Sequence, residues 1–140
     1  KAKIVDPAGF AGGLFWMVDP RGGNIGGCCL SITLADYARM GQFALEGGKG
    51  AVPEGWFAEV TDSAVDFGDS GFGYGYQWWT YDDGSYAAQG IFGQGIFIDP
   101  NRRLVIASNG NWPTATDEDG VGREREAFYK AVQFAIDGRR

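Results

Sequence analysis

The stretch "AAQGIFGQGIFIDPNRRLVIASNG", residues 87–110, decides the fold of this chain. Two runs rich in β-branched and aromatic residues, 94–99 and 103–110, flank Pro100-Asn101, a typical turn. Strands joined by so short a connection pair antiparallel. Glycine occurs at positions 90, 93 and 95, just before and at the start of the first run, where a strand normally carries bulky side chains. This density of glycine indicates either a bulge or a close approach of the backbone to another group.

The residues before this pair extend it into a larger sheet. The aromatic run "YGYQWWTY", 74–81, is typical of a strand, and Asp82-Asp83-Gly84 after it is a hairpin signal. A further strand is expected in "SYAAQGIF", 85–92. Sequential strands with short connections predict an antiparallel meander.

Helical patterns lie on both sides of the predicted sheet. Thr33 can cap a helix that continues through Leu45, and Pro53 can start a shorter helix that ends near Thr61. A short strand is expected around 13–18, and a last helix over about 122–137. The sequence therefore predicts one α+β domain portion over residues 1–140, with helices before an antiparallel meander and a C-terminal helix packed on it.

Composition and charge exclude several classes of protein. The 140 residues are 44% hydrophobic and 15% aromatic, which is typical of a globular chain. A net charge of −6 argues against a nucleic-acid partner, which would need a concentrated basic patch. No run approaches the roughly 18 apolar residues of a membrane span, so no membrane partner is expected.

The two cysteines, Cys28 and Cys29, are adjacent. Because neighbouring cysteines pair only through a strained ring, no structural disulfide is expected, and the cytoplasm is slightly favoured over the periplasm. With no histidine and no spaced cysteines, the sequence predicts neither a metal site nor another cofactor. The absence of histidine also removes the usual general base.

No complete catalytic set occurs in the sequence. None of the serines at 31, 63, 70, 85 and 108 has a lysine three residues later, and without histidine no Ser-His-Asp triad can form. The acidic groups Asp82-Asp83 and 117–119 are expected to be solvated loop charges, although Asp117 could meet a cationic substrate end.

Several segments together resemble the serine β-lactamase-like hydrolases, which include class C β-lactamases, penicillin-binding-protein-like esterases and 6-aminohexanoate-dimer hydrolases. The resemblance runs from about residue 12 to residue 137. It is carried in order by "GGNIGGCCLSITLADYARMGQFALEGG", "VPEGWFAEVT", "GYGYQWW" and "QGIFGQGIFIDPNRRLVIASNGNWP". No single motif is decisive, and the order and spacing of the segments make the resemblance specific.

The resemblance implies that part of the catalytic machinery lies elsewhere. In this family a Ser-x-x-Lys motif supplies the nucleophile and its base, and a Tyr-x-Asn-type motif supplies a second proton carrier. Both come before the matched segments, and neither occurs in this sequence. We therefore expect the chain to be the C-terminal part of such a hydrolase. Its expected partners are a small ester or amide substrate and the N-terminal remainder of the domain, in the same chain or a separate one.

The family's third motif, Lys/His-x-Gly, matches Ala88-Gln89-Gly90, or Gln89-Gly90-Ile91 in a shifted alignment. The cationic or imidazole side chain is absent, which argues against a β-lactamase and favours an esterase or amidase. The resemblance implies that the backbone N–H of Ile91 contributes to an oxyanion hole. The expected substrate-binding residues are Gln89, Gly90, Phe92, Trp16 and Trp112.

Each of these residues also has a plainer interpretation. Gly90 can mark an ordinary bulge, Gln89 can be an exposed strand residue, and the tryptophans can serve packing alone. The whole chain can instead be a non-catalytic binding or structural module that retains the fold. One version is a carbohydrate-binding module that uses Tyr74, Tyr76, Trp78 and Trp79.

Overall fold

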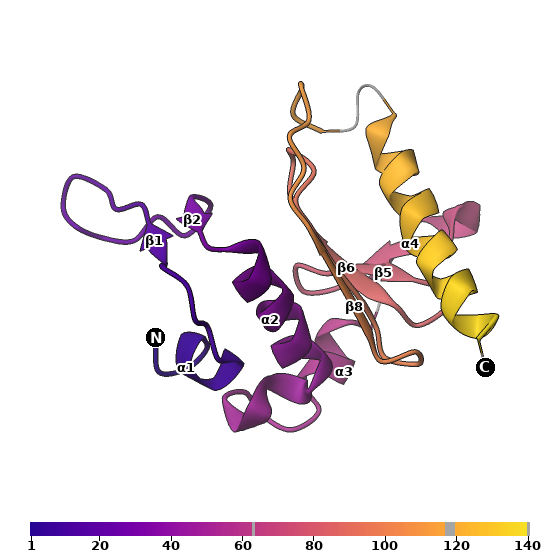
Figure 1. Ribbon diagram of the computed structural model, residues 1–140, viewed down its shortest axis with the longest axis horizontal. Coiled ribbons are helices and arrows are strands. Elements are labelled where there is room, and N and C mark those ends of the chain that lie inside the picture. The colour runs from indigo at the N-terminus through magenta and orange to yellow at the C-terminus, as the bar shows by residue number, and fades with distance from the viewer. Residues whose placement is uncertain (63, 117–119, 140) are drawn as a thin grey trace.

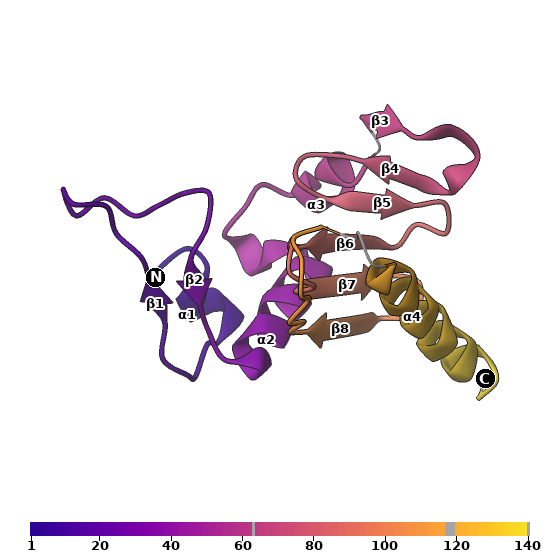
Figure 2. The same ribbon diagram turned by 90° about the horizontal axis from the view of Figure 1, so that it is seen from above.

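A six-stranded antiparallel sheet forms the centre of the computed structural model, which describes residues 1–62, 64–116 and 120–139. The strands lie in the order of the sequence, β3 to β8, so the predicted meander is confirmed. Figure 2 shows the strands side by side from β3 at one edge to β8 at the other. Their bounds are β3 Val65–Asp66, β4 Phe72–Tyr74, β5 Trp79–Tyr81, β6 Tyr86–Gln89, β7 Gly95–Asp99 and β8 Leu104–Ser108.

Helix α2, Leu34–Leu45, covers one face of the sheet across β7 and β8. It starts as predicted at Thr33, whose hydroxyl accepts a hydrogen bond of 3.1 Å from the Asp36 N–H. The core on this side joins Ala44 of the helix to three buried strand residues, Tyr86, Ile96 and Ile98.

Helix α4, Val121–Asp137, lies against the opposite face, so the sheet stands between α2 and α4 (Figure 1). Its fully buried Tyr129 stacks on Phe97 of β7 with ring centroids 4.5 Å apart. At the far end of the helix, Gln133 Nε2 donates to the buried carboxylate of Asp99 at 2.7 Å. The predicted C-terminal helix on the sheet is thus confirmed.

The region before α2, residues 1–33, lies to one side of the sheet and contains little regular structure (Figure 1). It comprises α1, Val5–Ala8, and the two-stranded pair of β1, Phe15–Trp16, with β2, Leu30–Ser31. The buried carboxylate of Asp36 connects this region to α2. The carboxylate accepts hydrogen bonds from the N–H groups of Ala11 at 2.9 Å and Gly12 at 2.8 Å. The bond from Ala11 is the main cause that lowers the Asp36 pKa to about 2. The remaining short helices are η1 Gly47–Gly50, α3 Trp56–Val60 and η2 Gly68–Ser70.

Four predicted elements differ from the structure. The run 74–81 is not one strand: a turn closed by the Gly75 N–H on the Trp78 carbonyl at 2.9 Å divides it between β4 and β5. The strand expected around 13–18 is reduced to Phe15–Trp16, and the strand expected over 85–92 ends at Gln89. The short helix starts at Trp56 rather than at Pro53, because Gly55 before it has a left-handed φ of 79°.

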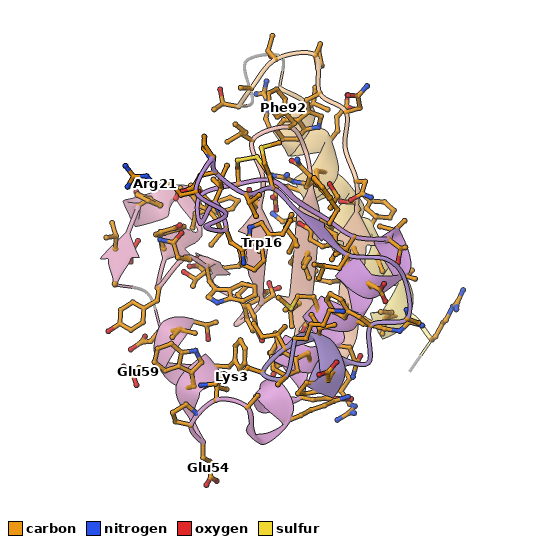
Figure 3. All side chains as sticks on the ribbon, turned by 90° about the vertical axis from the view of Figure 1, so that its left-hand side faces the viewer. Lys3, Trp16, Arg21, Glu54, Glu59 and Phe92 are labelled. Carbon is orange, nitrogen blue, oxygen red and sulfur yellow. A yellow bond between two sulfur atoms is a disulfide. The ribbon has the colours of Figure 1, made fainter. Side chains whose placement is uncertain are left out.

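The expectation about the cysteines was wrong. Cys28 and Cys29 form a disulfide, which is the yellow bond in Figure 3. Cys29 has a φ of 74°, a left-handed conformation that is uncommon for residues other than glycine. The preference for the cytoplasm rested on unpaired cysteines, and its premise does not hold in the structure.

Candidate functional site

The glycine-rich stretch forms a tight connection between β6 and β7. The Gly90 N–H donates to the Gln94 carbonyl at 2.8 Å, and the Gly93 N–H donates back to the Gly90 carbonyl at 3.1 Å. The side chain of Gln94 folds over the connection and accepts a hydrogen bond of 3.1 Å from the Phe92 N–H. Residues 90–94 therefore form a turn at the end of the strand pair rather than a bulge within a strand.

Each of the three glycines has its own packing reason. A Cβ at Gly90 would lie 2.5 Å from Gln94 Oε1, and a Cβ at Gly95 would lie 2.5 Å from the Tyr129 hydroxyl. Gly93 has a φ of 88°, and a Cβ there would overlap the indole of Trp112. The glycines thus allow a side chain or a second loop to lie directly on the backbone.

That second loop follows β8 and is fastened to the turn by its backbone. The Trp112 N–H donates to the Phe92 carbonyl at 3.2 Å, and the Thr116 N–H donates to the Ile91 carbonyl at 2.8 Å. The N–H of Ile91 donates to no other group in the part of the chain that the structure describes, and the residue is 58% exposed. The turn therefore presents a free backbone donor at its surface.

A partly buried polar network lies behind the turn. Gln89 Nε2 donates to the Tyr81 hydroxyl at 3.0 Å and to Glu126 Oε1 at 3.1 Å. Its Oε1 accepts a hydrogen bond of 2.6 Å from Arg125 Nη2. The amide of Gln89 is thus held between β5 and α4, and a substrate would have to displace these partners in order to bind it.

The network shifts the pKa values of its acidic members. Burial raises the pKa of the Tyr81 hydroxyl, and the nearby Glu126 charge raises it further. Burial also raises the pKa of Glu126, although hydrogen bonds from Tyr81 and Gln89 and the charge of Arg125 oppose this effect. Tyr81 therefore remains a neutral donor to Glu126, at 3.0 Å.

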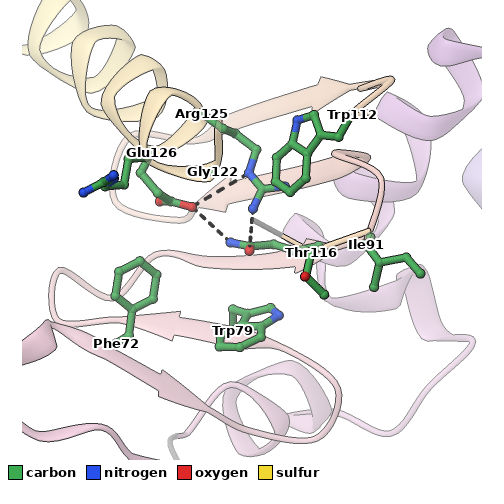
Figure 4. A pocket seen from close by; sticks show the side chains of 11 residues that line it. Phe72, Trp79, Ile91, Trp112, Thr116, Gly122, Arg125 and Glu126 are labelled. Atoms are coloured by element: carbon green, nitrogen blue, oxygen red, sulfur yellow. Dashed lines mark hydrogen bonds and ion pairs between the residues drawn. The ribbon is translucent and has the colours of Figure 1, made fainter. Parts of the chain in front are cut away.

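A cavity of about 510 Å³ opens beside this network (Figure 4). Aromatic and aliphatic side chains from β4, β5 and the two loops form its walls, and the polar groups of Gln89, Arg125 and Glu126 lie together on one side. The Arg125 guanidinium lies 4.9 Å from the ring centroid of Trp112. The lining residues are Phe72, Trp79, Gln89, Gly90, Ile91, Trp112, Thr116, Gly122, Arg123, Arg125 and Glu126.

The structure brings together most, but not all, of the residues predicted for the site. Gln89, Gly90, Ile91 and Trp112 line the cavity, and Phe92 lies next to it in the turn. Trp16 does not line it: its indole donates to the Ile25 carbonyl at 2.8 Å within the N-terminal region, and Figure 3 shows it apart from Phe92. Asp117 lies outside the described residues.

Sequence reasoning missed the contribution of α4. Arg125 and Glu126 stand four and three residues before Tyr129, so they share the sheet-facing side of the helix. Charged residues on the sheet-facing side of a helix are unusual. The position of Arg125 and Glu126 on that side is therefore the sequence signal that could have identified them as site residues. Within the described part of the chain there is no metal-binding cluster of histidine, cysteine or acidic residues, and no helix there could cross a membrane.

Comparison with known proteins finds two relatives described as 6-aminohexanoate-dimer hydrolases. No family model matches the chain. It is 32% identical over 111 residues to the 6-aminohexanoate-dimer hydrolase of Paenarthrobacter ureafaciens, and the match covers 69% of this chain and 28% of that protein. A Bacillus anthracis structure provisionally described as a 6-aminohexanoate-dimer hydrolase superposes with a TM-score of 0.73 at 21% identity, over 89% of this chain and 34% of that one. The chain thus spans about a third or less of the length of these relatives.

Proposed function

Because the chain belongs to the serine β-lactamase-like hydrolase family, we propose that it forms part of a serine hydrolase that cleaves ester or amide bonds through an acyl-enzyme. The nucleophile and its base come from polypeptide outside these 140 residues, either in the same chain or in a separate one. The chain contributes the turn that holds the carbonyl of the substrate.

The free N–H of Ile91 is the observation that carries this proposal. An oxyanion hole needs rigid N–H donors aimed at the position where negative charge develops, and such donors must not be engaged elsewhere. The Ile91 carbonyl is held by Thr116 at 2.8 Å, which fixes the orientation of the turn. Gly90 beside it leaves room for the Gln94 side chain, whose Oε1 would lie 2.5 Å from an added Cβ, and this packing holds the turn in shape.

A non-catalytic binding module is the second candidate. Two observations favour it. The sequence contains no Ser-x-x-Lys motif and no histidine. The cavity has the volume and the largely apolar walls of a small-molecule binding pocket. In that case the turn would shape a ligand site without taking part in a reaction.

Hydrolysis of p-nitrophenyl butyrate separates the two candidates. The experiment compares the 140-residue chain alone, the same chain together with polypeptide that carries a Ser-x-x-Lys motif, and that assembly with the serine changed to alanine. We expect turnover only in the second preparation, with a fluorophosphonate label on its serine. Turnover by the 140-residue chain alone would contradict the proposal, and an inactive, unlabelled assembly would favour the binding module.

A further inference from the structure

Helix α4 carries a second apolar stripe on the side that faces away from the sheet. Its sheet-facing side holds the buried residues Tyr129 and Gln133. The opposite side repeats apolar residues at helical spacing, and all of them are exposed: Ala127, Phe128, Ala131, Phe134 and Ala135. Phe134 is 80% exposed and Phe128 is 54% exposed. Since a solvent-facing helix side normally carries charged and polar residues, this stripe is typical of a surface that another molecule covers.

The stripe is symmetric about its central residue. In "AFYKAVQFA", residues 127–135, Phe128 and Phe134 each stand three residues from Ala131. Ala127 and Ala135 each stand four residues from it. A two-fold axis through Ala131 would place Phe128 of one copy against Phe134 of the other, as a self-complementary interface requires. The small alanine side chains allow two helix backbones to approach closely along the same line.

The charges beside the stripe favour an antiparallel pair of helices. Arg123, Lys130 and Asp137 follow one flank of the stripe at intervals of seven residues. In an antiparallel pair, Arg123 of each copy would lie beside Asp137 of the other. The Asp137 carboxylate already binds Arg102 at 2.8 Å and is still 47% exposed, so it can accept from a second cation. Lys130 would face its own copy, and its long side chain can turn to water. A parallel pair would place like ends of the helix dipoles together and would not form the two Arg123–Asp137 pairs.

We propose that the chain forms a homodimer in which α4 of one protomer packs antiparallel on α4 of the other, with Ala131 on the two-fold axis. Four phenylalanine rings meet in this interface, and each can bury on the order of 150–250 Å². The total area lies near the lower end for specific interfaces, so we expect a Kd of about 10–100 µM. The dimer goes beyond the proposed hydrolase function, because it uses neither the 90–94 turn nor a nucleophile.

Analytical ultracentrifugation of the 140-residue chain tests the proposal. The average mass should rise from 15.1 kDa toward twice that value as the concentration is raised from about 1 to about 500 µM. Ala131→Glu places two carboxylates on the axis, so it should raise the Kd at least about ten-fold. Ala58→Glu makes the same change at an exposed position of α3 and should leave the Kd unchanged.

Cross-linking tests the direction and register of the helix pair. Cys28 and Cys29, the two cysteines of the chain, are bonded to each other, so a bismaleimide joins only cysteines that are introduced. Ala127→Cys should cross-link to Ala135→Cys of a second, ¹⁵N-labelled copy. It should not cross-link to itself, because an antiparallel pair separates the two 127 positions by about 12 Å along the helix axis.

Four results would overturn the proposal. The first is an unmodified chain that stays monomeric at the highest concentration, a result that does not depend on how a variant folds. The second is an unchanged Kd in Ala131→Glu, and the third is self-cross-linking of Ala127→Cys, which would indicate a parallel pair. The fourth is a monomer whose α4 stripe is protected from hydrogen exchange only in the assembly with the Ser-x-x-Lys polypeptide, which would assign the stripe to that polypeptide. None of these readouts depends on turnover, so the dimer and the hydrolase function can fail separately.

Discussion

The carboxylate of Asp36, buried at the start of α2, accepts a hydrogen bond of 2.8 Å from the backbone N–H of Gly12. Together with the bond from Ala11, it connects the irregular N-terminal region to the helix that packs on the sheet. Thr33 and Arg39 also donate to this carboxylate, at 3.0 and 2.8 Å. The contact therefore holds the region before α2, residues 1–33, against the start of the helix.

Replacement of this carboxylate by an amide should loosen the N-terminal region. In Asp36→Asn the amide group would direct its own N–H donors at a backbone N–H, so we expect the melting temperature to fall by roughly 5 °C at neutral pH. The measurement is thermal unfolding by circular dichroism. An unchanged melting temperature would show that the contact contributes nothing to stability.

The same variant should also change how stability depends on pH. Because folding lowers the Asp36 pKa from 3.8 to about 2, its stabilising effect is complete above pH 4 and is lost as the pH falls toward 2. The difference in melting temperature between the unmodified chain and Asp36→Asn should therefore shrink over this interval. A constant difference from pH 6 to pH 2 would contradict this assignment.

The close contact of α2 with the sheet depends on Gly41. A Cβ there would lie 2.5 Å from Val105 Cγ1 and 2.6 Å from Ile96 Cγ2. Although alanine is favoured over glycine within a helix by about 1 kcal/mol, we expect Gly41→Ala to lower the free energy of unfolding by about 1–2 kcal/mol through overpacking. Urea denaturation measures the change.

Two further variants separate overpacking from other causes. Gly13→Ala, at a position with open space around it, should have little effect on stability. The double variant Gly41→Ala/Val105→Ala should lose less stability than the sum of its single changes, because one of the two clashes is removed. Strict additivity would contradict the proposed contact.

The packing of the two loops at the candidate site depends on Gly93. Gly93→Ala would strain a φ of 88° and also push the added methyl group into Trp112, whereas Gly22→Ala strains a similar φ of 83° in open space. We expect Gly22→Ala to cost about 1 kcal/mol, and Gly93→Ala to cost clearly more and to change the tryptophan emission. Equal losses in the two variants would mean that Trp112 does not press on the turn.

The fold could largely be predicted from the sequence because its signals are local. The turn at Pro100-Asn101, the cap at Thr33 and the apolar face of the last helix each act within a few residues. The division of 74–81 could not be predicted, since it arises from contact between distant segments. A Cβ at Gly75 would overlap the carbonyl oxygen of Val60, so the backbone turns there against α3.

The candidate site, too, depends on contacts between distant segments that could not be predicted from the sequence. The glycines at 90, 93 and 95 indicated a close approach, but their individual partners became clear only when the 109–116 loop and α4 were in place. Arg125 was missed because its significance depends on meeting Gln89, which is 36 residues earlier in the chain. Trp16 was included because of its residue type, and its hydrogen bond to Ile25 places it in a separate region.

The central claim is that the N–H of Ile91 stabilises the oxyanion of a hydrolase. The most direct measurement is kcat for p-nitrophenyl butyrate in the assembly that carries the Ser-x-x-Lys motif, compared among the unmodified chain, Ile91→Val and Ile91→Pro. Proline removes the N–H, so kcat should fall by about 10²–10³, whereas valine retains the donor and should preserve kcat within about three-fold. Circular dichroism should confirm that both variants fold. A folded Ile91→Pro assembly with unchanged kcat would contradict the account.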